Sequence, residues 1–127
     1  MNSEHPNIKI DVEPRPDGVV LAHVSGEVDA LTEPVLRDCV DQQLRSSRHF
    51  VLDLDAVRFL SASGLAALLD IKRRASRGGL RWSLVAAGHA VRRPLQATGL
   101  DQQLPVYPTV GKALAAVSPV VPWTVAG

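Results

Sequence analysis

The chain has 127 residues, of which 46% are hydrophobic, 21% are charged and 4% are aromatic, with a single cysteine. This size and balance are typical of one globular domain. One cysteine excludes an internal disulfide and a cysteine-based metal cluster. No apolar run approaches the roughly 20 residues that span a bilayer, and the first residues lack the basic and apolar regions of a signal peptide. We therefore expect a single-domain, cytoplasmic protein without membrane insertion.

The charged residues are unevenly distributed along the chain, although the net charge is only +1. Residues 1–57 hold eleven acidic and five basic side chains, whereas residues 58–127 hold two acidic and nine basic ones, which gives balances of −6 and +7. The asymmetry indicates either a dipolar surface that attracts a partner or pairs two copies in a homodimer, or simply solvated helix faces. The basic cluster between residues 58 and 93 has few interleaved aromatic residues, so it does not favour nucleic-acid binding.

The first third of the chain predicts a hairpin followed by a helix. Residues 1–7 are polar and contain a proline, so we expect a flexible N-terminus. Residues 8–12 alternate between apolar and polar side chains and predict a strand. A turn with two prolines and a glycine separates it from a β-branched strand at 19–25. Thr32 is expected to cap a helix that runs to about residue 46.

The rest of the chain alternates between strand and helix. A near-continuous apolar run at 50–54 predicts a strand that is buried on both faces. The strongly helical segment after the turn at 61–64 ends at two consecutive glycines. The later elements are expected to be a strand at 80–86, a helix at 90–98 (or from Arg92, because of Pro94), an edge strand at 104–107 and a helix capped by Thr109 that ends at residue 117.

Strands that alternate with helices predict a parallel sheet with crossover connections, here opened by an antiparallel hairpin. We therefore predict an α/β sandwich with a mixed, mostly parallel sheet and about four helices. The domain is expected to cover residues 8–117, followed by a proline-rich C-terminal tail at 118–127.

Motifs for catalysis are missing from the sequence. Ser63 lacks the glycines two positions before and after it that a nucleophile elbow needs. The four histidines do not have the spacing of metal ligands on a helix, and there is no glycine-rich phosphate-binding loop. We therefore expect a protein that is not an enzyme and has no metal or cofactor.

The Ser-Ala-Ser-Gly turn at residues 61–64 is the one segment that carries chemistry. It lies between a buried strand and a helix, so it forms the N-cap and first helical turn, where unpaired N–H groups favour anions. A hydroxyl there caps the helix, a contribution of about 1 kcal/mol. Alternatively it accepts a phosphoryl group, whose charge of about −1.5 to −2 changes any surface packed over the turn. On its own the turn favours capping, because serine is a preferred N-cap residue.

Five short segments of the chain form a recognisable series: Gly-Glu-Val-Asp at 26–29, Val-Leu-Asp-Leu at 51–54, Phe-Leu-Ser-Ala-Ser-Gly-Leu at 59–65, Leu-Gln-Ala-Thr-Gly-Leu at 95–100 and Lys-Ala-Leu at 112–114. Together they resemble the STAS domain of the anti-sigma factor antagonist (anti-anti-sigma factor) family over residues 8–117. The resemblance implies a STAS-type sandwich that binds an anti-sigma factor of the serine kinase type and releases its sigma factor. It also implies that this kinase phosphorylates the antagonist and that a phosphatase reverses the modification.

The turn departs from the family at the phosphorylated position. The family's turn reads Asp-Ser-Ser-Gly or Asp-Ser-Thr-Gly, with the phosphorylated serine two residues before the glycine. In this chain that position is Ala62, the aspartate position is Ser61, and the second hydroxyl position is Ser63. The antagonist is therefore constitutive, or Ser63 or Ser61 accepts the phosphate instead, or sigma control has been lost. Retained binding with altered regulation is our preferred interpretation.

The loop at 26–31 and the turn at 59–65 both follow strands of the parallel part of the sheet. We therefore expect them to lie at the same end of the sheet and to form a partner-binding surface. The alternatives are that Leu60 and Leu65 pack in the core and that Asp29 caps the following helix. The residues expected to bind the partner are Gly26, Glu27, Asp29, Leu60, Ser61, Ala62, Ser63, Gly64 and Leu65.

Two other functions stay open at this point. The resemblance also allows a STAS subunit that serves a transporter or a stress-signalling complex. A small enzyme with Ser63 as its nucleophile is the second alternative, for which the sequence offers no obvious base.

Overall fold

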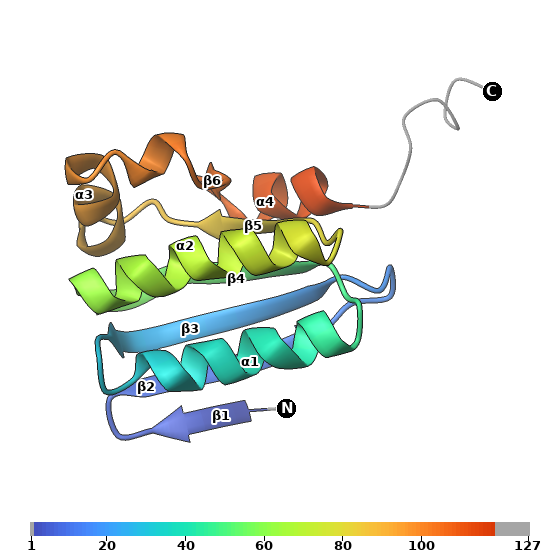
Figure 1. The fold of residues 1–127 in the computed structure, drawn as a ribbon, viewed down its shortest axis with the longest axis horizontal. Coiled ribbons are helices and arrows are strands. Elements are labelled where there is room, and N and C mark those ends of the chain that lie inside the picture. The colour runs from blue at the N-terminus through green and yellow to red at the C-terminus, as the bar shows by residue number, and fades with distance from the viewer. Residues whose placement is uncertain (1, 119–127) are drawn as a thin grey trace.

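The computed structural model describes residues 2–118 (Figure 1). This part of the chain forms six strands, four α-helices and one 3₁₀-helix. In chain order these are β1 (Asn2–His5), β2 (Ile8–Pro14), β3 (Val20–Val28), α1 (Glu33–Arg45), β4 (Phe50–Leu60), α2 (Ala62–Arg77), β5 (Trp82–Val85), α3 (His89–Ala97), the 3₁₀-helix η1 (Leu100–Gln102), β6 (Val106–Tyr107) and α4 (Val110–Val117). The predicted tail at 118–127 lies outside the described residues, except for Ser118.

The strands form one sheet in the order β1-β2-β3-β4-β5-β6. β2 is antiparallel to both β1 and β3, whereas β3, β4, β5 and β6 are parallel to their neighbours. Helices α1, α2 and α3 provide the crossovers between the parallel strands. The predicted α/β sandwich, with a mixed sheet opened by a hairpin, is therefore confirmed.

The N-terminus differs from the flexible segment expected at residues 1–7, because Asn2–His5 form β1. This strand pairs with β2 across a tight turn, with His5 opposite Ile8. Within the turn, the Asn7 N–H donates to His5 Nδ1 at 3.2 Å, and the Asn7 carbonyl accepts from the Glu27 N–H at 2.8 Å. Backbone pairing to the open edge of β2 needs no apolar alternation, so this polar sequence gave no strand signal.

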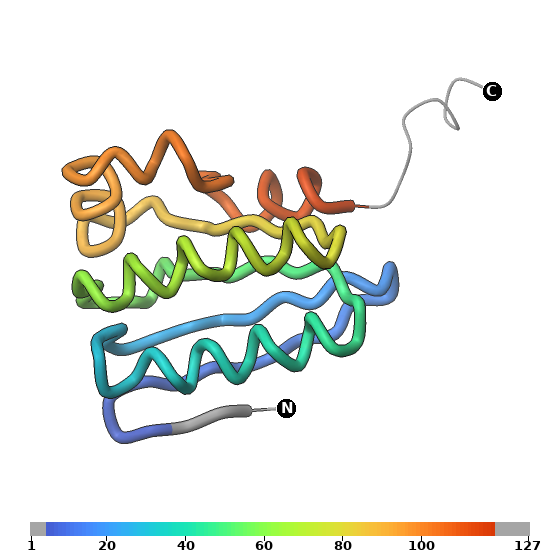
Figure 2. Tube along the Cα trace, viewed as in Figure 1, coloured from blue at the N-terminus to red at the C-terminus, as the bar shows by residue number. Residues whose placement is uncertain are grey.

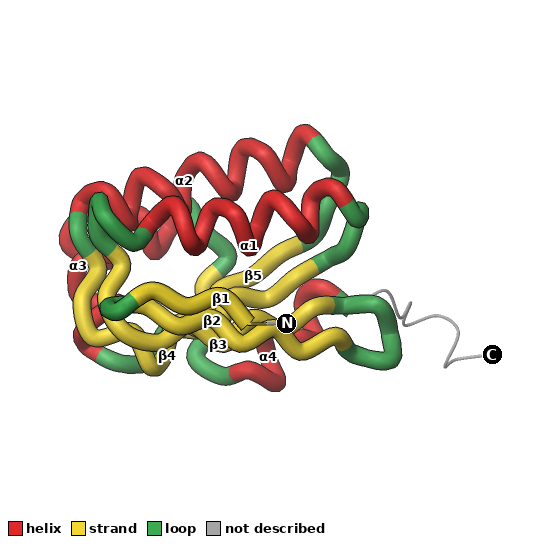
Figure 3. Tube along the Cα trace, turned by 90° about the horizontal axis from the view of Figure 1, so that it is seen from below, coloured by secondary structure: helices red, strands yellow, loops and turns green. Residues whose placement is uncertain are grey.

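The helices cover the two faces of the sheet unequally. Figure 3 shows α1 and α2 side by side on one face and α4 on the other. The large core lies under α1, α2 and α3 and includes the fully buried side chains of Leu36, Phe50, Leu52, Leu68, Ile71 and Leu84. The smaller cluster lies under α4 and contains Val19, Leu21, Val51, Val85, Ala113 and Val117. Because Phe50 and Val51 enter different clusters, β4 is buried on both faces, as its continuous apolar run predicts.

Several element boundaries differ from the predicted ones. β4 runs on to Leu60 because it stays paired with the end of β3 through two irregularities in register. α3 begins at His89 and contains Pro94 in its interior. The proline removes the one hydrogen bond that its missing N–H would donate to the carbonyl of Ala90, and the helix ends three residues later. β5 and β6 are shorter than expected, whereas α4 begins after Thr109 as predicted, with the Thr109 hydroxyl accepting from the Lys112 N–H at 3.2 Å.

Part of the charge asymmetry is neutralised between α1 and α2. Arg37 of α1 pairs with Asp70 of α2 and with Glu33 one turn earlier in α1. The hydrogen bond to the Glu33 carboxylate, with added attraction from Asp70, raises the pKa of Arg37 above its ordinary value. Asp41 of α1 pairs with Arg74 of α2 in the same way. The Asp41–Arg74 pair joins an acidic side chain of the first half to a basic one of the second half, whereas the Arg37–Asp70 pair joins the opposite charges.

Cys39 is buried on α1, and burial raises the pKa of its thiol to about 11. Within residues 2–118, every helix is too short or too polar to cross a membrane.

Candidate partner-binding site at the carboxyl end of the sheet

Ser61 forms the junction between β4 and α2. It is the N-cap residue of α2, and its hydroxyl oxygen accepts a hydrogen bond from the Gly64 N–H at 3.2 Å. Its own N–H donates to the carbonyl of Val28 at the end of β3, at 2.9 Å. Ser61 is therefore a capping residue, and its backbone attaches the start of α2 to the neighbouring strand.

Gly64 lies in the first turn of α2, packed against the end of β3. A Cβ atom at this position would lie 2.6 Å from Leu60 Cδ1 and 3.0 Å from both the Val28 Cγ1 and carbonyl oxygen atoms. Real Cβ contacts are essentially never as short as the first of these. Gly64, expected among the partner-binding residues, therefore allows a close approach of α2 to the protein's own sheet.

The two remaining residues of the turn face outward to different degrees. Ala62 is exposed and Ser63 is half-buried. Within the described residues, the Ser63 hydroxyl makes no hydrogen bond. Ala62 is thus an exposed methyl group, with the unpaired Ser63 hydroxyl next to it.

The loop between β3 and α1 is held by its own side chains. Asp29 Oδ1 accepts hydrogen bonds from the N–H groups of Leu31 and Thr32, each at 3.0 Å. The buried Thr32 hydroxyl donates to the Glu27 carbonyl at 2.7 Å and accepts from the Asp29 N–H at 3.0 Å. The Thr32 side chain therefore does not cap α1 as predicted. It folds the loop instead, and the Asp29 carboxylate binds loop amides rather than the amides of α1.

Gly26 has a structural role in β3. Its φ angle is +101°, and a Cβ atom would lie 2.3 Å from the carbonyl oxygen of Asn7. Only glycine combines this positive φ with such a close approach of backbone to backbone. Glu27, the next residue, is half-buried, and its carboxylate has no ion-pair or hydrogen-bond partner within residues 2–118.

The predicted loop and turn do lie together at one end of the sheet. In the parallel register Glu27 is opposite Phe59 and Val28 is opposite Leu60. Figures 1 and 2 show the β3–α1 loop beside the start of α2, in agreement with the hydrogen bond from Ser61 to Val28.

The exposed apolar side chains at this end differ from the predicted ones. Leu60 is buried, with 6% exposure, and Leu65 packs against the core, so the core-packing alternative holds for both. Leu31 is 74% exposed and Phe59 is 51% exposed, and they are the large hydrophobic residues that stand out from the surface of the described chain. Leu31 belongs to the loop at 26–31 that was expected to bind the partner, although the sequence did not single it out.

An exposed turn on a small α/β sandwich, with apolar side chains standing out beside it, has the features of a protein-binding domain. Residues 10–113 match the family model described as the STAS domain. The chain belongs to the STAS domain family.

Named relatives agree with this assignment. The chain is 32% identical to the anti-sigma-F factor antagonist RsfA of Mycobacterium tuberculosis, over 79% of this chain and 80% of RsfA. It is 29% identical to RsfB, an anti-sigma-F factor antagonist of the same species, over 80% of this chain and 83% of RsfB. The crystal structure of an anti-sigma factor antagonist from Mycobacterium paratuberculosis is similar, with a TM-score of 0.80, 38% identity and coverage of 91% of this chain and 98% of that one.

Proposed function

We propose that this chain is an anti-sigma factor antagonist, a cytoplasmic binding protein that captures an anti-sigma factor and thereby releases a sigma factor. The observation that carries the proposal is the similarity to antagonists of that name over most of the length of both chains. The matched segment includes β3, β4 and the start of α2, which build the exposed turn. The function is therefore assigned to binding rather than to catalysis.

The proposed contact surface consists of the β3–α1 loop and the turn at 59–63. Leu31 and Phe59 provide its apolar contacts, because each exposes half or more of its surface at this end of the sheet. Burying the exposed part of such a side chain contributes about 1–2 kcal/mol. The Glu27 carboxylate, unpaired within the described chain, adds a negative group beside Phe59, which suits a partner surface that combines apolar and basic side chains.

The proposed regulation differs from that of the family because Ala62 has no hydroxyl. The Ser61 hydroxyl oxygen already accepts the hydrogen bond from the Gly64 N–H as the helix cap, so it is the less available phosphate acceptor. The Ser63 hydroxyl is unpaired and half-buried, so it is the better of the two candidates. We therefore expect an antagonist that a kinase-type anti-sigma factor binds but does not switch off through position 62, and a phosphatase has a role only if Ser63 is modified.

A negative charge at the turn acts on the partner more than on the fold. The N-terminus of a helix stabilises an anion by about 0.3–1 kcal/mol, so α2 itself tolerates the charge. Under a desolvated contact the same charge loses its hydration, and breaking such a contact typically costs several kcal/mol. This difference explains why a hydroxyl at the exposed position 62 makes a switch and a methyl group does not.

Titration calorimetry with the cognate anti-sigma factor tests the binding surface. Leu31→Ala and Phe59→Ala are each expected to weaken binding about fivefold or more, and Ala62→Glu about tenfold or more. Ala115→Glu is the matched control, because Ala115 is an exposed alanine on α4. Absence of anti-sigma factor binding by the wild-type chain would overturn the function. Equal effects of the two glutamate variants would overturn the location of the surface.

Intact-mass spectrometry after incubation with the kinase and ATP tests the regulation separately. We expect no added phosphoryl group on the wild-type chain, and one on the Ala62→Ser variant. If the wild-type chain gains a phosphoryl group that the Ser63→Ala variant does not gain, the antagonist is regulated through Ser63 and is not constitutive.

A further inference from the structure

A concave site that shares no lining residue with the turn at 59–65 lies between α3 and the last two strands. It is a cavity of about 260 Å³, bordered by residues of α3, of η1 and of the ends of β5 and β6. Its lining residues are Ala86, Arg92, Leu95, Gln96, Asp101, Val106, Tyr107 and Pro108. The cavity follows the carboxyl ends of β5 and β6.

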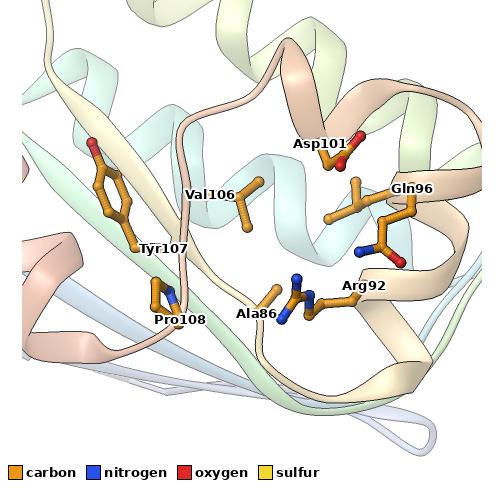
Figure 4. A pocket seen from close by; sticks show the side chains of 8 residues that line it. Ala86, Arg92, Gln96, Asp101, Val106, Tyr107 and Pro108 are labelled. Atoms are coloured by element: carbon orange, nitrogen blue, oxygen red, sulfur yellow. The ribbon is translucent and has the colours of Figure 1, made fainter.

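The polar groups of this cavity are few and come mainly from one helix. Figure 4 shows the Arg92 guanidinium and the Gln96 amide extending from α3 toward Ala86 and Val106, whereas the Asp101 carboxylate points away from Arg92. Within residues 2–118, neither the Arg92 guanidinium nor the Gln96 amide has a side-chain hydrogen bond or an ion pair. Asp101 is in contact with the Gln102 amide, at 3.4 Å. The cavity therefore presents one guanidinium without an ion pair and one free amide, with the Asp101 carboxylate at its border directed away from Arg92.

The rest of the lining is apolar and backed by the core. Leu95 and Ala86 are buried parts of the main hydrophobic cluster, and Val106 packs against it. Pro108 and Tyr107 also border the cavity, although Figure 4 shows the Tyr107 ring pointing away from Arg92, toward the smaller cluster under α4. A cavity with an apolar wall and a small number of placed polar groups is the usual form of a small-molecule site.

We infer that this cavity binds a small organic carboxylate with an apolar body. A guanidinium binds a carboxylate through two parallel hydrogen bonds, and the apolar wall would bury the rest of the ligand. A single cation suits a monoanion better than a dianionic phosphate ester. The volume is slightly below the roughly 300–1,000 Å³ of drug-sized pockets, which limits the ligand to about ten non-hydrogen atoms. The inference does not depend on the proposed function, because the site is separate from the turn.

Two-dimensional ¹H–¹⁵N NMR of the full chain, titrated with benzoate, tests this site. We expect saturable shifts centred on the amides of Ala86, Gln96 and Val106. Benzamide has the same shape without the charge. We expect it to bind at least about tenfold more weakly, because the hydrogen bonds between charged groups are lost. Inorganic phosphate is expected to cause no saturable shift at these amides.

Two arginine variants separate a site from general charge attraction. Arg92→Gln removes the charge in the cavity, on an exposed position of α3, and is expected to weaken benzoate binding about tenfold. Arg93→Gln is the matched control, because Arg93 is an exposed neighbour outside the lining, and it is expected to bind as the wild type does. Shifts that do not saturate, that are equal for benzamide, or that persist in Arg92→Gln would overturn the inference.

Discussion

Replacing Gly64 by alanine is expected to destabilise the protein and to displace the start of α2. The added Cβ atom would lie 2.6 Å from Leu60 Cδ1 and 3.0 Å from the Val28 carbonyl oxygen. The leucine side chain can turn aside, but the carbonyl cannot, because it accepts the hydrogen bond from the Ser61 N–H. The clash is therefore relieved only if the first turn of α2 moves away from β3.

The size of the effect follows from two opposing terms. Overpacking of this kind typically costs about 1–3 kcal/mol, whereas alanine favours a helix over glycine by about 1 kcal/mol. Because the carbonyl is fixed, the upper part of the overpacking range applies, about 2–3 kcal/mol. The net loss is then about 1–2 kcal/mol, which lowers the melting temperature of a chain this size by roughly 3–8 °C. Since residues 61–63 move with the helix, binding of the anti-sigma factor should weaken as well.

Thermal unfolding followed by circular dichroism measures this change, with Gly111→Ala as the matched control. Gly111 also lies in a helix, but a Cβ atom there would meet nothing within 4 Å. That variant should be stabilised by about 0.4–1 kcal/mol. If Gly64→Ala melts at or above the wild-type temperature, the close packing of α2 on β3 does not determine which residue is accepted at this position.

Two further predictions concern other parts of the chain. Ser61→Ala removes the hydroxyl that accepts from the Gly64 N–H and should lower the free energy of unfolding, measured in urea, by about 1 kcal/mol. Ser63→Ala is the control and should stay within about 0.5 kcal/mol of the wild type. Equal losses in the two variants would contradict the capping role of Ser61. The thiol of Cys39, with its pKa raised by burial from 9.0 to about 11, should not react with a disulfide reagent at pH 8 until the protein unfolds. Because the pKa of the thiol is higher in the folded than in the unfolded protein, the stability that the protonated thiol contributes is complete below about pH 9 and is lost as the pH rises toward 11. Cys39→Ala should remove this dependence of stability on alkaline pH. A stability profile over pH identical to that of the wild type would refute the prediction.

The elements that the sequence predicts best are those with a regular pattern of apolar side chains. The hairpin of β2 and β3, the doubly buried β4 and the capped α4 each follow from a periodic pattern with a turn or cap residue at its end. β1 was missed because its pairing depends on backbone groups of β2, and backbone groups leave no pattern in the sequence. The same reason explains the length of β4, whose second half is determined by its pairing with β3.

The candidate site could be located from the sequence, but its surface could not. The order of strands and helices correctly placed the loop after β3 beside the turn after β4. Thr32 was predicted to cap α1, yet its hydroxyl binds the Glu27 carbonyl, a choice that only the folded loop decides. Leu60 and Phe59 are adjacent and both apolar, and the irregular register at the end of β3 and β4 determines which of them is buried.

The sequential strand order has a consequence for how the molecule is made. Each strand pairs with its neighbours in the chain, so no strand has to enter between two that are already joined. During synthesis the sheet can grow at one edge as each new strand leaves the ribosome, and the α2 turn can form before β5, β6 and α4 exist. A ribosome-bound chain that stops before β5 would already hold both strands and both helices that border the turn.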